Sequence, residues 1–114
     1  MCGILGIGFN KDHEMYNKKA QLKALITELF EKTQSRGRIA TGIAAMNRSK
    51  IHFMKQKMSA ENFVEKKEFS YFLDKVIDFE KEEYAKTNSL LSIIGHCRLN
   101  TKGTPNNNLN NHPI

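Results

Sequence analysis

The sequence predicts a single domain of the α+β class. Two long stretches carry apolar residues at helical spacing, and they predict two amphipathic helices. Apolar runs before, between and after these stretches have the length and composition of β-strands. The chain has 114 residues, which suits one compact domain and leaves too little for two.

The first element is a strand over Met1–Phe9, an almost wholly apolar run that we expect to be buried. Gly6 and Gly8 interrupt the run. Glycine inside a strand often marks a bulge or the close approach of another backbone.

A helix follows over Tyr16–Thr33. Its apolar residues repeat at i, i+3, i+4, i+7 and i+8, which predicts one face packed against a core. These residues are Leu22, Leu25, Ile26, Leu29 and Phe30. Arg36 and Gly37 end the helix, and we expect Gly37 to adopt the left-handed conformation that glycine favours after a helix.

A hairpin comes next, with strands over Thr41–Asn47 and Ile51–Lys57 joined by a turn at Arg48–Lys50. The first of these strands is rich in small apolar residues. Because successive side chains of a strand alternate between its two sides, alternate positions of the second strand share a face. These positions are Ile51, Phe53 and Lys55.

The remaining elements are two helices, a strand and a loop. Ser59 can cap a short helix over Ala60–Val64, and an amphipathic helix is predicted over Phe69–Tyr84. Ser89–Leu99 has the apolar composition of a buried strand. Residues 101–114 are rich in Asn and contain Pro, so we expect a loop.

The composition indicates a soluble protein with a solvated, lysine-rich surface. The net charge is +6, but 14 of the 18 basic residues are lysines scattered among 12 acids, so nucleic-acid binding is not favoured. No apolar run approaches the roughly 20 residues of a membrane span, and no secretion signal opens the chain. We therefore expect a cytoplasmic protein.

The two cysteines, Cys2 and Cys97, are expected to be reduced thiols, because no secretion signal is present. No CxxC pair occurs, which excludes a zinc ribbon. His96, Cys97 and His112 are the conceivable metal ligands, but nothing in their spacing fixes a coordination geometry. We expect neither a metal nor a cofactor.

Cys2 directly follows the initiator methionine. If Met1 is removed, Cys2 carries both a thiol, with a pKa of about 8.5, and a free amine, with a pKa of about 8. An N-terminal amine beside a side-chain nucleophile can act as its base. The alternative is that Cys2 is a small apolar residue opening a buried strand.

Two arginines stand at the ends of predicted elements. Arg98 follows a nearly apolar strand, where a cation is costly unless it meets an anion, and its planar fork suits a carboxylate. A structural salt bridge is the alternative for Arg98. Arg36, after the first helix, taken alone is a surface residue.

Three separated segments together resemble the class II glutamine amidotransferases, whose glutaminase domains use an N-terminal nucleophile. The segments are Met1-Cys2-Gly3-Ile4-Leu5-Gly6, Arg36-Gly37-Arg38-Ile39-Ala40-Thr41-Gly42, and Gly95-His96-Cys97-Arg98-Leu99-Asn100-Thr101-Lys102-Gly103 leading into Asn110-Asn111-His112-Pro113-Ile114. The resemblance implies an αββα sandwich. We expect residues 1–114 to be its N-terminal portion, a single domain incomplete at the C-terminus.

The resemblance also implies an activity. Cys2 would attack the side-chain amide of glutamine, and its own amine would serve as the base. A thioester would form and be hydrolysed, giving glutamate and ammonia for an unknown acceptor. Arg36 would support the strand of the nucleophile. Arg98 would hold the substrate's α-carboxylate, and the other residues implied around the substrate are Thr101, Lys102, Asn110 and His112.

The chain departs from the family in three places. Ile39 stands where the family has an aspartate, and Lys102 where many members have a histidine. The family also continues beyond the His-Pro pair to a strand that supplies an oxyanion hole. We therefore expect either a second chain or self-association to complete the sheet, with a non-catalytic binding homologue as the alternative function.

Overall fold

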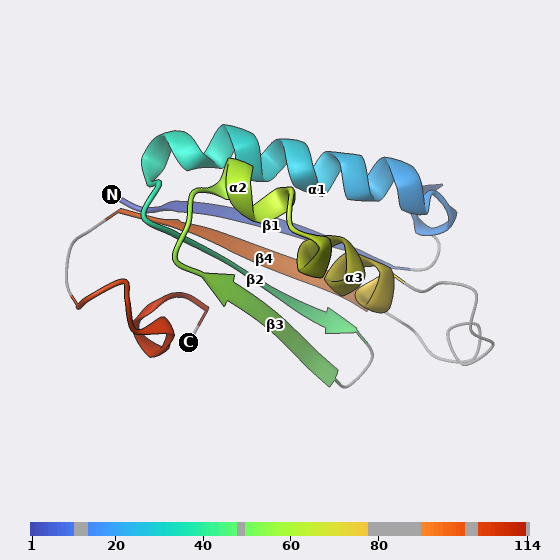
Figure 1. Ribbon diagram of the computed structural model, residues 1–114. Coiled ribbons are helices and arrows are strands. Elements are labelled where there is room, and N and C mark those ends of the chain that lie inside the picture. The colour runs from blue at the N-terminus through green and yellow to red at the C-terminus, as the bar shows by residue number, and fades with distance from the viewer. Residues whose placement is uncertain (11–13, 48–49, 78–89, 100–102, 114) are drawn as a thin grey trace.

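The computed structural model of this chain describes residues 1–10, 14–47, 50–77, 90–99 and 103–113. They form a four-stranded antiparallel sheet with helices packed on one face (Figure 1). The strands are β1 (Gly3–Asn10), β2 (Ala40–Asn47), β3 (Lys50–Gln56) and β4 (Leu90–Arg98). The helices are α1 (Lys19–Thr33), α2 (Ala60–Val64) and α3 (Lys67–Val76), and short 3₁₀ turns are η1 (Glu14–Asn17), η2 (Gln34–Arg36) and η3 (Asn108–Asn110). The predicted α+β class is confirmed.

The strands lie in the order β1-β4-β2-β3, so the last of the described strands is central and the first is at an edge. β1 pairs with β4 from Gly3 opposite Cys97 to Asn10 opposite Leu90. β4 also pairs with β2, and β2 pairs with β3 in the predicted hairpin. The two ends of the described chain are thereby brought together at one end of the sheet (Figure 1).

The core lies between the sheet and the helices. Phe30 of α1, Phe63 of α2 and Phe69 of α3 form an aromatic cluster with ring centroids 5.4–5.9 Å apart. Gly95 of β4 packs beneath it, since an added Cβ there would lie 2.6 Å from the Phe30 ring. The buried apolar residues contributed by the strands are Leu5, Ile43, Ala45, Leu91, Ile93 and Cys97.

The helix predictions are confirmed in type and partly wrong in extent. α1 begins at Lys19 rather than at Tyr16, because the turn η1 precedes it. The short helix Ala60–Val64 is confirmed. α3 ends at Val76, since Ile77 leaves the helical conformation. The rest of its predicted C-terminal part, residues 78–84, lies outside the described residues. No helix in the described part of the chain is long and apolar enough to cross a membrane.

The bounds of the strands are confirmed to within two residues. The prediction that the first strand is buried holds for one of its faces only. Leu5 faces the helices and is 6% exposed, whereas the neighbouring Ile4 is 77% exposed. β1 alternates in this way because it is an edge strand with the helix layer on one side only.

The prediction that Gly37 is left-handed is wrong, because its φ of 177° is extended backbone. The glycine is needed for close packing instead. An added Cβ would lie 2.3 Å from the backbone carbon of Arg98, and the N–H of Ile39 donates to the Arg98 carbonyl at 3.0 Å. The segment after η2 therefore rests directly on the end of β4.

Residues 103–113, called here the C-terminal segment, return across the face of the sheet that the helices leave uncovered (Figure 1). The predicted loop is largely confirmed and includes the short turn η3. Its path crosses β2 at Gly42, where an added Cβ would lie 1.9 Å from the His112 carbonyl oxygen. Only glycine allows this contact between the two backbones.

Candidate functional site

Cys2 lies at the open end of β1, immediately before the first paired residue of the strand. Its Sγ accepts a hydrogen bond from the backbone N–H of Leu99 at 3.3 Å, so the thiol lies beside the end of β4. The side chain is partly exposed, and Met1 before it is 83% exposed. The chain is therefore open to solvent up to the Cys2 side chain.

Arg36 lies on the helix side of the same strand. An added Cβ on Gly3 would be 3.0 Å from the Arg36 Cβ and 2.6 Å from Thr33, so η2 is packed tightly on the start of β1. The Arg36 side chain itself is exposed. Arg36 thus lies beside the start of the strand that follows Cys2.

Arg98 is only 4% exposed, and its guanidinium holds the C-terminal segment. The side chain donates to Oδ1 of Asn111 at 2.6 Å, to the Gly103 carbonyl at 2.6 Å and to the Asn110 carbonyl at 3.2 Å. Several N–H groups of the fork are thus engaged by neutral acceptors of the chain itself. A substrate carboxylate would have to replace some of these bonds.

Asn111 is the main side-chain partner of Arg98, and sequence reasoning singled out its neighbour Asn110 instead. Asn111 is 1% exposed, and its Nδ2 donates to the Pro105 carbonyl and to Oδ1 of Asn108, each at 3.0 Å. Asn110 meets Arg98 through its backbone carbonyl. Nothing in an asparagine-rich segment distinguishes the one side chain that becomes buried.

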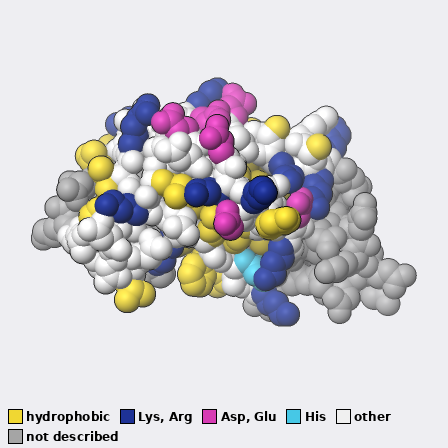
Figure 2. Space-filling model, viewed as in Figure 1, with side chains coloured by type: hydrophobic (Ala, Val, Ile, Leu, Met, Phe, Trp, Pro, Cys, Tyr) yellow, Lys and Arg dark blue, Asp and Glu magenta, His cyan; other side chains and the backbone are white. Residues whose placement is uncertain are grey.

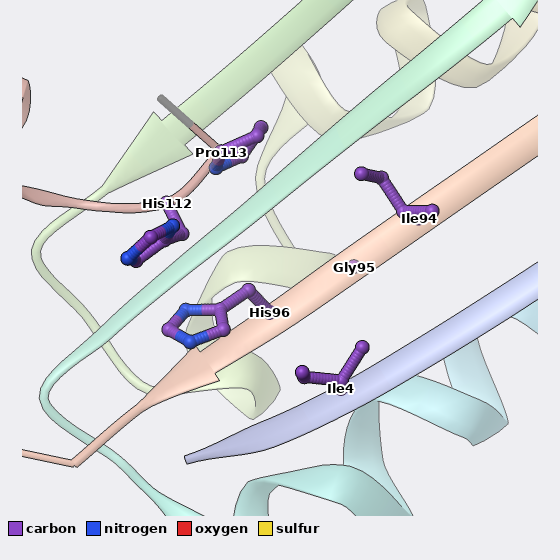
Figure 3. A pocket seen from close by; sticks show the side chains of 6 residues that line it. All are labelled: Ile4, Ile94, Gly95, His96, His112 and Pro113. Carbon is purple, nitrogen blue, oxygen red and sulfur yellow. The ribbon is translucent and has the colours of Figure 1, made fainter.

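The ring of His112 lies against that of His96 of β4 on the uncovered face, with ring centroids 4.6 Å apart and the ring planes tilted by 52° (Figure 3). Burial lowers the pKa of His96, and electrostatic interactions with His112 and Arg98 lower that pKa further. His96 is therefore neutral near pH 7, where an imidazole can both donate and accept a hydrogen bond.

Lys55 of β3 also holds the C-terminal segment and was not predicted as a site residue. Its Nζ donates to the carbonyls of Asn111 at 2.9 Å and Pro113 at 2.8 Å. The available signal was its position, because Lys55 shares a strand face with Ile51 and Phe53. A lysine among apolar residues on one face needs acceptors nearby.

A cavity of about 330 Å³ opens beside the imidazole pair (Figure 3). One of its lining residues is Ile4, which follows Cys2 by two positions in the chain. Its lining is apolar apart from the two rings, and comprises Ile4, Ile94, Gly95, His96, His112 and Pro113. The volume is at the lower end of the range of about 300–1,000 Å³ typical of small-molecule sites.

Cys97 differs sharply from Cys2. It is fully buried, and burial, followed by the nearby Cys2, raises the pKa of its thiol to about 11. It therefore stays protonated and unreactive near neutral pH. Both cysteines are free thiols, and within the described ranges no group of three or more His, Cys, Asp or Glu is arranged to hold a metal ion.

The fold thus gathers most of the predicted site residues at one end of the sheet. Cys2, Arg98, Asn110 and His112 belong to strand ends and the segment that meet there, and Arg36 lies on the helix side. Thr101 and Lys102 lie outside the described residues. Comparisons with protein-family models, with curated proteins and with solved structures found no match for this chain.

Proposed function

We propose that this chain is the glutaminase part of a glutamine amidotransferase, with Cys2 as its nucleophile. The observation that carries the proposal is the meeting of two strand ends: the Cys2 thiol opens β1 and contacts Leu99, which directly follows Arg98. Glutamine hydrolysis needs a nucleophile to attack the amide and a cationic group, here a guanidinium, to bind the α-carboxylate. The sequence resemblance supplies the substrate.

In the proposed reaction the free amine of Cys2 accepts the thiol proton, and the sulfur attacks the side-chain amide carbon of glutamine. The C–N bond then breaks, and the ammonium group returns the proton to the departing ammonia. Water, deprotonated by the same amine, hydrolyses the resulting thioester. Glutamate leaves and the thiol is restored.

The proposed carboxylate contact with Arg98 requires a rearrangement of the C-terminal segment. Gly103 and Asn111 each accept a hydrogen bond of 2.6 Å from this guanidinium. Glutamine binding would exchange these neutral acceptors for an anionic one, which forms stronger hydrogen bonds. The nearby cavity at Ile4 and His96 could then accommodate part of the substrate.

A mass measurement with 6-diazo-5-oxo-norleucine, a glutamine-shaped electrophile, tests the proposal. We expect a single adduct on protein that has lost Met1 and none on the Cys2→Ala variant. The matched control carries two extra residues before Met1, which leaves the thiol in place but prevents exposure of its amine. An adduct that persists in Cys2→Ala would contradict the proposal, as would no adduct on folded protein lacking Met1.

A non-catalytic binding module is the second candidate. The observation that favours it is the commitment of the buried Arg98 to its own C-terminal segment, together with a sheet face that the helices leave uncovered. In this case a second chain, or a second copy, would cover that face. Unaltered partner binding by Cys2→Ala together with no glutamine turnover would favour this candidate.

A further inference from the structure

The sheet face opposite the helices, called here the open face, includes three cross-strand rows to which all four strands contribute. The strand register places one residue of each strand in every row. The first row is Ile4, His96, Gly42 and Lys55. The second row is Gly6, Ile94, Ala44 and Phe53, and the third is Gly8, Ser92, Met46 and Ile51.

The C-terminal segment covers part of the first row, whereas the large apolar side chains of the other two rows are exposed and only the small Ala44 is buried. The exposed fractions are 55% for Ile94, 65% for Phe53, 69% for Ile51 and 38% for Met46. Ala44 lies between Ile94 and Phe53 in the same row, so these side chains form one patch. Monomeric proteins rarely expose contiguous apolar patches of this kind unless they bind something.

Glycines on this face allow another backbone to lie close to the sheet. Gly42 already does so, because the His112 carbonyl lies where its Cβ would be. Gly6 and Gly8 occupy the same side of β1, and an added Cβ at either would meet no atom closer than 3.9 Å. They leave room for a further segment, running beside the one already present.

The charged side chains that the described strands and residues 103–113 place on the open face are all basic. No strand of the sheet contains Asp or Glu, and neither do residues 103–113. The 12 acids all fall within residues 12–31 and 61–83, and those visible in Figure 2 gather over the helices. Lys55 and Arg98 lie at the same end of the open face, where the acceptors of Lys55 are backbone carbonyls.

We infer that the open face binds an extended segment of a different polypeptide, apolar at one end and acidic at the other. Its apolar side chains would cover Ile94 and Phe53, its backbone would pass over Gly6, and its carboxylates would meet Lys55. In a second copy of this chain, neither the four strands nor residues 103–113 offer a carboxylate that could neutralise that lysine. The inference rests on the partner-binding part of the proposed function and is independent of Cys2 chemistry.

Two labelled synthetic peptides test the inference by fluorescence anisotropy. Both begin with three Val-Ser repeats; one ends in three aspartates and the other in three lysines. At 50 mM salt we expect the acidic peptide to bind the full chain at least tenfold more tightly than the basic one. The difference should shrink at 500 mM salt, because ionic screening shortens the range of the attraction.

Variants locate the binding. Gly6→Val fills open space on β1 and Phe53→Ser removes an exposed ring, so both should fold and both should weaken binding of the acidic peptide at least fivefold. Tyr71→Ser is the matched control, because Tyr71 of α3 is 69% exposed on the helix layer. It should bind like the wild type. Circular dichroism checks that each variant is folded.

Several outcomes would overturn the inference. They include equal binding of the two peptides, unchanged binding by Gly6→Val and Phe53→Ser, and an equal loss of peptide binding in Tyr71→Ser.

A dimer in sedimentation that Gly6→Val dissociates would assign the face to a second copy. Capture by 7:3 phosphatidylcholine–phosphatidylserine vesicles that Phe53→Ser abolishes would assign it to a membrane. Cys2→Ala should bind the acidic peptide as the wild type does, because binding does not depend on the thiol. A failure of the glutaminase proposal would therefore leave the binding result unchanged.

Discussion

At the scale of single residues, the fold gives two identical side chains opposite chemistry. Cys2 lies at a strand end with part of its surface exposed, whereas Cys97 lies against the carbonyl of Phe30 inside the core. The difference comes from strand alternation, since residues facing the helices lose their water and a buried thiolate is strongly disfavoured. The sequence alone could not rank the two thiols in this way.

Alkylation measures this difference. With iodoacetamide at pH 8, we expect the native protein to gain one adduct, on Cys2, while Cys97 stays unmodified because its pKa is about 11 and it is fully buried. Peptide mass mapping identifies the modified residue. In guanidinium chloride both should react. Modification of Cys97 at the rate of Cys2 in the native protein would contradict the described burial.

At the scale of elements, the C-terminal segment is held on the sheet by contacts that local sequence cannot reveal. Lys55 and Arg98 come from different strands, and both donate to the same short stretch around Asn111. Gly42 adds a steric requirement from a third strand. Each of these residues has an ordinary position in its own element, and only the pairing of strands shows what they do together.

A pair of glycine substitutions tests how the segment is held. Gly42→Ala would place a methyl group 1.9 Å from the His112 carbonyl, so the segment must shift, and we expect a loss of roughly 2 kcal/mol in the free energy of unfolding. Gly6→Ala is the control, because its methyl group meets only open space, and it should change stability by less than about 0.5 kcal/mol. Urea denaturation measures both. Equal effects would refute this account.

At the scale of the whole molecule, helices cover one face of the sheet, and none of its four strands contains an acidic residue. The types of most elements followed from apolar periodicity, because the spacing of Leu22, Ile26 and Phe30 reflects the face that a helix buries. The strand order and the open face could not be predicted from apolar periodicity. They depend on β4 pairing with β1 and β2, which are distant in the chain.

The free energy of unfolding should fall on acidification, because two partly buried histidines have lowered pKa values. The pKa values of His96 and His52 lie below their usual value of about 6.5, each mainly through burial. Between the lowered values and about 6.5 the unfolded chain therefore binds more protons, so the free energy of unfolding decreases as the pH falls through this window. His96→Gln should flatten the decrease between pH 7 and 5 in urea titrations. A steeper decrease in that variant, or a wild type that gains stability on acidification, would reverse the assigned sign.

The central position of β4 has a consequence for the order of events during synthesis. The hydrogen bond between Leu99 and the Cys2 sulfur joins residues 97 positions apart, and β1 can take its place in the sheet only through β4. Contacts of such long range form late and slow folding. On a growing chain, the first residues made must therefore wait for residues near 98 before the surroundings of the thiol exist. The Cys2 thiol would acquire its neighbours only when translation of this region is complete.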